Sequence, residues 1–68
     1  MYKMKTEISD NIKKQRLNRK LADKIGVTEG YISQIINLKK IDISKTVAYA
    51  LTKAISSDLE IENIFEIM

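Results

Sequence analysis

Apolar residues recur at intervals of three or four positions along most of the chain, which predicts short helices joined by turns. Met4, Ile8 and Ile12 lie four positions apart and indicate one face of a first helix, for which Thr6 is a candidate N-cap. The sequence has no proline, no glycine- or serine-rich linker and no internal repeat. The pattern therefore predicts helices that follow one another closely along the chain.

Two further helices are predicted next, with a sharp turn between them. Apolar residues at four-residue spacing indicate the second helix: Leu17, Leu21 and Ile25. Asn18 is its candidate cap, and Gly26 suits the left-handed conformation that commonly ends a helix. Thr28 is a candidate N-cap for the third helix, which ends near Asn37. The apolar stripe of this third helix consists of Ile32, Ile35 and Ile36.

The last third of the chain predicts two more helices. Ser44 is a candidate cap for a fourth helix, whose inward face holds Val47, Ala48, Leu51, Ala54 and Ile55. Ser57 and Glu60 have the spacing of a capping box and predict a fifth helix over residues 58–67, with a face of Ile61, Ile64, Phe65 and Met68. Isoleucine-rich segments also pair as strands, and the pattern leaves this alternative open. The expected fold is all-α, a compact bundle of four to five short helices.

Composition limits the classes of function. A chain of 68 residues allows one domain, residues 1–68, and its 44% hydrophobic content is ordinary for a protein with a packed core. Without cysteine or histidine it has no disulfides, no thiolate zinc site and no imidazole acid or base. No carboxylate pair is clustered, and neither Ser33 nor Tyr31 has a neighbouring base. We therefore expect no enzyme activity, no metal and no cofactor.

Charge is distributed unevenly along the chain. Residues 1–40 contain ten basic and four acidic residues, a formal charge of +6, whereas residues 41–68 contain two and five, a formal charge of −3. A basic half suits a phosphate-binding surface, although a solvated lysine-rich surface has the same charge. No apolar run is long enough to span a bilayer, and the first residues do not resemble a signal peptide. We expect a cytoplasmic protein without membrane contact.

Residues 18–37 have the pattern of a helix-turn-helix motif. Two short helices that meet nearly at a right angle need a small residue at the crossing, a glycine at the turn and apolar anchors under the later helix. Ala22 and Gly26 supply the first two. The complete motif core is Leu21, Ala22, Ile25, Gly26, Val27, Ile32 and Ile35. A helical corner without any role in nucleic-acid binding has the same geometry, and this alternative stays open.

This region resembles the Cro and repressor type of helix-turn-helix domain, the XRE-like family of phage and bacterial regulators. The resemblance runs from about Ile12 to Phe65 and is sharpest in residues 21–28, which read LADKIGVT, and 31–37, which read YISQIIN. It implies a lambda-repressor-like DNA-binding domain, and a small transcriptional regulator such as the Cro-like repressor of a phage or mobile element. Members usually bind a two-fold symmetric double-stranded DNA operator as a homodimer.

The chain departs from the family pattern at three places. Only nine positions separate Ile12 from Leu21, fewer than in the longer repressors, which leaves the join between the first two helices open. Leu38 stands where the family usually has glycine. Because leucine is strained in the left-handed region, we expect Asn37 to adopt that conformation or the turn to differ. The proline-containing start of the fourth helix is replaced by Asp42 and Ile43.

The resemblance also implies the residues that contact DNA. Candidates for base contacts lie at the start of the third helix: Thr28, Glu29, Gly30, Tyr31, Ser33 and Gln34. Candidates for phosphate contacts flank it: Arg16, Asn18, Arg19, Lys20, Asn37, Lys39 and Lys40. Glu29 either accepts a hydrogen bond from cytosine N4 or only favours the helix dipole. Tyr31 either contacts DNA or covers the helix pair.

The predicted fifth helix is a candidate dimer interface. Its apolar residues exceed what one terminal helix needs to dock: Ile61, Ile64, Phe65, Ile67 and Met68. The alternative is that they complete the core of the monomer. Two other functions on the same fold stay open, an antitoxin- or adaptor-like module that holds a protein partner through this helix, and an excisionase-like architectural factor. Glu29 and Gly30 favour these, whereas the basic flanks favour sequence-specific DNA binding.

Overall fold

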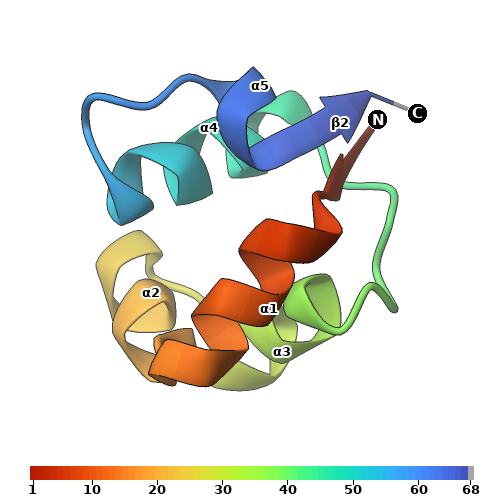
Figure 1. Cartoon of the computed structure of the whole chain (residues 1–68). Coiled ribbons are helices and arrows are strands. Elements are labelled where there is room, and N and C mark those ends of the chain that lie inside the picture. The colour runs from red at the N-terminus through yellow and green to blue at the C-terminus, as the bar shows by residue number, and fades with distance from the viewer. Residues whose placement is uncertain (68) are drawn as a thin grey trace.

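Five short helices and two three-residue strands form the computed structural model, which describes residues 1–67. In chain order they are β1 (Tyr2–Met4), α1 (Thr6–Gln15), α2 (Asn18–Ile25), α3 (Glu29–Ile36), α4 (Lys45–Ile55), α5 (Ile61–Ile64) and β2 (Phe65–Ile67). Helices α1, α2 and α3 lie on one side of the molecule, and α4, α5 and both strands lie on the other (Figure 1). The predicted helical bundle is confirmed, with a small sheet added to it.

The caps of α3 and α4 are the predicted ones. Thr28 Oγ1 accepts a hydrogen bond from the backbone N–H of Tyr31 at 3.1 Å, and Ser44 Oγ accepts one from Val47 at 3.4 Å. Gly26 ends α2 with a φ of 75°, in the left-handed region that glycine adopts without strain. These short-range signals were sufficient to predict where α2 ends and where α3 and α4 begin.

The predicted caps of the first two helices are wrong. Thr6 and Asn18 are the first helical residues of α1 and α2, and the cap positions belong to Lys5 and Leu17. Met4, expected on the face of the first helix, lies in β1 instead. The reason for the first error is the strand, because the extended backbone of Lys5 still pairs with the C-terminal segment and donates its N–H to the carbonyl of Ile64 at 2.9 Å.

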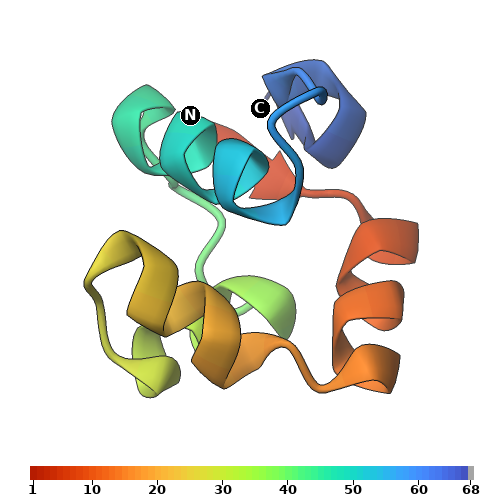
Figure 2. The ribbon, with the colours of Figure 1, turned by 90° about the vertical axis from the view of Figure 1, so that its left-hand side faces the viewer.

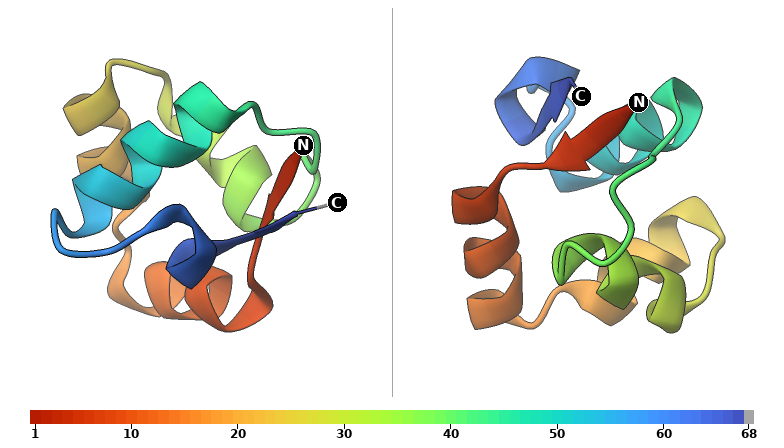
Figure 3. Two further views of the ribbon diagram at one scale, coloured as in Figure 1. Left: turned by 90° about the horizontal axis from the view of Figure 1, so that it is seen from above. Right: turned by 90° about the vertical axis from the view of Figure 1, so that its right-hand side faces the viewer.

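The C-terminal segment also differs from its prediction. Helix α5 has four residues and is capped by Glu60 together with Asn63, not by the expected Ser57–Glu60 box. The chain then becomes β2, which pairs antiparallel with β1 so that Met4 lies opposite Phe65. A helix over 58–67 is therefore wrong, and the strand alternative holds for residues 65–67. Met68 lies outside the described residues. Figure 3 shows the two strands side by side, with both termini at the same side of the molecule.

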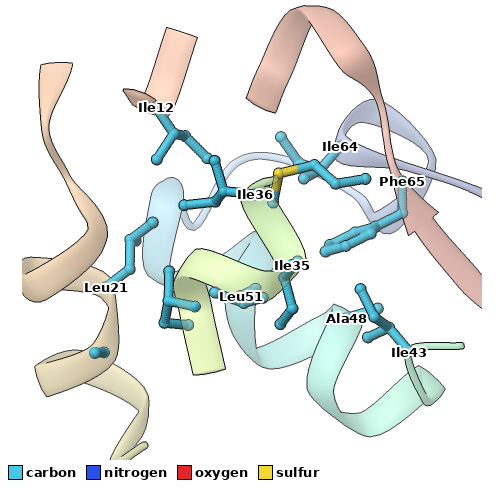
Figure 4. Packing of buried hydrophobic residues seen from close by; sticks show 12 residues of the cluster. Ile12, Leu21, Ile35, Ile36, Ile43, Ala48, Leu51, Ile64 and Phe65 are labelled. Atoms are coloured by element: carbon cyan, nitrogen blue, oxygen red, sulfur yellow. The ribbon is translucent and has the colours of Figure 1, made fainter. Parts of the chain in front are cut away.

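One hydrophobic cluster receives side chains from all seven elements and from the loop before α4. Its buried members, shown in Figure 4, are Met4, Ile12, Leu21, Ala22, Ile32, Ile35, Ile36, Ile43, Ala48, Leu51, Ile64 and Phe65. Helix α2 packs against both α3 and α4, which lies above it in Figure 2. The motif is therefore anchored to the rest of the protein through its apolar face, and its opposite face stays exposed.

Two residues other than glycine adopt the left-handed conformation. They are Arg16, with a φ of 55° after α1, and Leu38, with a φ of 60° after α3. Asn37 has a φ of −81°, so the expectation that it would take this conformation in place of Leu38 is wrong. The side chain of Leu38 packs against the core, and this burial offsets a backbone strain of about 1–2 kcal/mol.

Candidate nucleic-acid interface

The two helices of the motif are joined by a tight turn around Gly26. The backbone N–H groups of Gly26 and Val27 both donate to the carbonyl of Ala22, at 2.9 and 3.1 Å. Ala22 is buried where α2 packs on α3, and Ile32 and Ile35 anchor α3 in the core below it. The other motif residues are buried or half-buried as predicted: Leu21, Ile25 and Val27. This arrangement fixes the orientation of α3 relative to α2.

The N-terminal part of α3 presents most of the predicted base-contact residues to solvent. Thr28, Glu29, Gly30 and Gln34 are exposed. Tyr31 is half-buried and packs against the core cluster. This position is compatible with both proposed roles, contact with DNA and cover for the helix pair. Gln34 is exposed, and α5 and β2 lie on the opposite side of the molecule from α3 (Figure 1). An exposed edge of α3 is available to a large ligand.

Ser33 and Asn18 are brought together. Asn18 Nδ2 donates to Ser33 Oγ at 3.1 Å, and this hydrogen bond ties the first turn of α2 to the middle of α3. Both side chains are half-buried. The Ser33 hydroxyl accepts this bond and keeps its own proton to donate, and Asn18 keeps its amide oxygen and its second N–H. Each residue therefore supports the geometry of the motif and retains polar groups for DNA.

A groove of about 340 Å³ lies where α1, α2 and α3 meet. It is lined by Lys13, Arg16, Asn18, Arg19 and Glu29. Three of these are predicted phosphate contacts, whereas Lys13 was missed. Lys13 enters the groove because α1 stops at the left-handed Arg16 and the chain turns directly into α2. Its position three residues before Arg16 on a helix was the only clue in the sequence.

The remaining predicted phosphate contacts fall into two groups. Lys20, Asn37 and Lys39 are exposed, and in residues 1–67 neither lysine forms an ion pair. Lys40 is half-buried, with its Nζ 3.3 Å from an oxygen of Asp42 and 5.8 Å from the centre of the Tyr31 ring. Lys40 is thus held against α3 by its own chain, which makes it a weaker candidate for a phosphate contact than Lys39.

A buried serine that the sequence analysis missed supports the end of α3. Ser9, which is 1% exposed, lies in α1 and donates its hydroxyl proton to the carbonyl of Ile36. The last carbonyls of a helix lack intrahelical donors, so this bond satisfies one of them inside the protein. The position of Ser9 three residues before Ile12, on the inward face of α1, was the available clue.

The candidate dimer residues are divided by the structure. Ile64 and Phe65 are each 1% exposed and belong to the core of the monomer, which corrects their assignment to an interface. Ile61 is half-buried, and Ile67 is 78% exposed at the end of β2. Ile61 and Ile67 also line an open groove of about 400 Å³ together with Tyr2. Met68, the fifth candidate, is not among the described residues.

Comparison with known proteins agrees with this geometry. A family model described as Helix-turn-helix matches residues 12–61, well over half of the chain. Searches of curated proteins and of solved structures give no significant match. In the part of the chain that the structure describes, every helix is too short or too polar to cross a bilayer. The matched family is one of DNA-binding proteins and not of enzymes. The chain therefore belongs to the helix-turn-helix family, in the XRE type that its sequence resembles.

Proposed function

We propose that this protein is a sequence-specific regulator of transcription that binds double-stranded DNA as a Cro-like repressor of a phage or mobile element. The observation that carries the proposal is the exposed N-terminal edge of α3, held by a buried apolar face and flanked by cations. In helix-turn-helix complexes the second helix lies in the major groove, and its first residues reach the base edges. α3 has the anchoring and the exposure that this docking requires.

Base reading is assigned to the polar groups on that edge. Gln34 is suited to a pair of hydrogen bonds with adenine N6 and N7, and Thr28 to a single hydrogen bond with a base edge or a contact between its methyl group and thymine. Gly30 has no side chain, which allows the backbone to approach the DNA closely. Tyr31 offers its hydroxyl to a phosphate or its ring edge to a thymine methyl. Ser33 adds a hydroxyl next to Gln34.

Phosphate binding is assigned to cations on both sides of α3. The groove residues Arg16 and Arg19 lie on one side, next to the first turn of α2, where free backbone N–H groups favour an anion. Lys39 and Asn37 follow the other end of α3, and Lys20 is exposed on α2. Contacts of this kind fix the register of the protein on the duplex and supply affinity that does not depend on sequence.

Dimerisation is assigned to β2, not to the helix that the sequence predicted. β2 pairs with β1 on one side, and within residues 1–67 no other strand covers its outer edge. The large apolar side chain of Ile67 is exposed at this edge, where it lines the groove together with Tyr2 and Ile61. An antiparallel pair of β2 strands around a two-fold axis would cover this surface and give a dimer with two recognition helices.

Selection of bound fragments from a pool of random duplexes tests the proposal, followed by titration of the enriched operator. We expect enrichment of a two-fold symmetric sequence. Four phosphate contacts per monomer predict a loss of affinity of about 100-fold per bound monomer between ~50 mM and ~200 mM salt. Absence of enrichment, or binding that is insensitive to salt, would contradict the proposal. Sedimentation equilibrium of the free protein tests the dimer: a homodimer supports the assignment to β2, and a monomer contradicts it.

A further inference from the structure

Glu29 lies in a groove lined by cations, whereas a base-reading residue is expected to face only the edges of the bases. We infer that Glu29 limits how tightly the basic groove between α1, α2 and α3 holds a polyanion, and that it sets overall affinity instead of reading a base. The inference rests on the proposed function, because DNA phosphate is the anion concerned. It concerns the same DNA-binding surface, but Glu29 weakens the binding of phosphate where the neighbouring cations strengthen it.

The geometry of the groove places one acid among three cations. Lys13 and Arg16 come from the end of α1, Arg19 from the first turn of α2 and Glu29 from the start of α3. Glu29 is exposed, and in residues 1–67 it forms no ion pair within 4 Å. Its negative charge is therefore not neutralised by a close partner. It acts on any anion that enters the groove.

A phosphate in this groove experiences opposing forces. The three cations and the free N–H groups of the first turn of α2 attract it, and the carboxylate of Glu29 repels it. The lining charges are largely exposed, so water screens each interaction strongly. Two like charges about 5 Å apart in water change an equilibrium constant by about fourfold. The expected effect of Glu29 is thus an affinity several-fold lower than the groove would otherwise have.

The repulsion acts on phosphate and is the same for every base sequence. Removal of the charge should strengthen binding to the operator and to unrelated duplexes by the same factor. The loss of a base-reading glutamate would instead weaken binding, and only to sequences in which it contacts cytosine. The two roles therefore predict different patterns across sequences.

Two variants and one matched control test the inference. Glu29→Ala removes the charge without adding a base reader, and Glu29→Gln keeps the size of the side chain. Glu7→Gln is the control, because Glu7 is also an exposed glutamate in the first turn of its helix, at the opposite end of α1 from the groove. Fluorescence anisotropy with the selected operator and with a random duplex gives the affinities. Elution from immobilised heparin gives a measure of polyanion binding that does not require a DNA site.

We expect both Glu29 variants to bind the two duplexes about three- to tenfold more tightly than the wild type, and to elute from heparin at higher salt. Glu7→Gln should stay within about twofold, the effect of one unit of net charge at a distance. Equal elution of the Glu29 and Glu7 variants would overturn the inference, and so would an effect confined to particular base pairs. If no duplex binds but the heparin shift appears, the proposed function fails and the inference on the groove stands.

Discussion

The α2–α3 corner and the β1–β2 sheet are built by interactions of different range. The turn and the cap of the corner are formed by hydrogen bonds between residues three to five positions apart, such as those to Thr28 and to the carbonyl of Ala22. The sheet joins the first residues of the chain to the last described ones, so that Tyr2 lies opposite Ile67. The turn and the cap of the corner therefore depend on local sequence, whereas the sheet requires the rest of the fold to bring its strands together.

The two regions also differ in charge and in the surface that they offer. The corner is surrounded by cations and exposes polar groups, as a DNA-binding surface requires. The sheet lies next to the acidic residues Glu62 and Glu66 and exposes the apolar side chain of Ile67. Glu66 is paired with Lys3 at 3.3 Å and Lys5 lines the same groove, so this surface lacks the excess of cations found around the corner. The proposed DNA-binding surface and the proposed dimer surface therefore lie on different parts of the molecule.

The largest expected effect comes from removing the anchor of the sheet, with Phe65→Ala. Phe65 is almost fully buried and packs edge-on against Tyr2, with ring centres 6.5 Å apart. We expect a loss of about 3–5 kcal/mol, a large part of the stability of a chain this short, measured by urea unfolding followed by circular dichroism. Ile67→Ala is the control and should cost less than about 0.5 kcal/mol in the monomer. Similar costs for the two variants would contradict the division between core and exposed surface.

A smaller effect is expected at Ser9, which connects α1 to the end of α3. Ser9→Ala leaves the carbonyl of Ile36 buried without its donor, at a cost of about 1–3 kcal/mol in the free energy of unfolding. The same urea titration measures it. Ser57→Ala replaces an exposed serine and should change the free energy by less than about 0.5 kcal/mol. An equally small change at Ser9 would show that the bond contributes nothing to the position of α3.

The smallest effect is expected for Arg16→Gly, which should increase the stability of the fold and weaken the binding of DNA. Arg16 adopts a left-handed conformation that glycine takes without strain, so Arg16→Gly should stabilise the fold by about 0.5–1 kcal/mol. The same change removes a cation from the groove and should reduce the salt dependence of DNA binding by about one phosphate contact. Thermal unfolding and a salt titration measure the two effects. Arg16→Lys, which keeps the charge and the strain, should leave both unchanged.

The sequence predicted the features that depend on neighbouring residues and missed those that depend on residues far apart in the chain. Gly26, Thr28 and Ser44 act through residues only a few positions away, and the end of α2 and the starts of α3 and α4 were predicted correctly from them. The strand at residues 65–67 was not, because its partner is at the other end of the chain and isoleucine-rich segments suit helix or strand. The error at Thr6 has the same origin, since β1 extends the chain up to Lys5.

The exposure of the polar edge of α3 was predicted, but the contacts that support this edge were not. The exposed edge of α3 follows from apolar spacing alone, since Ile32, Ile35 and Ile36 fix the opposite face. The bond from Asn18 to Ser33 and the contact of Lys40 with Tyr31 depend on how helices and loops pack, which spacing along the chain does not determine. Lys13 joins the groove for the same reason.

The central claim, that α3 reads bases while its flanks hold phosphates, is tested most directly by comparing Gln34→Ala with Lys39→Ala on the selected operator and its single-base variants. We expect Gln34→Ala to reduce discrimination at particular base pairs by about 5- to 150-fold, and Lys39→Ala to weaken binding to all duplexes alike with a smaller salt slope. The same loss from both variants on every duplex would contradict the account.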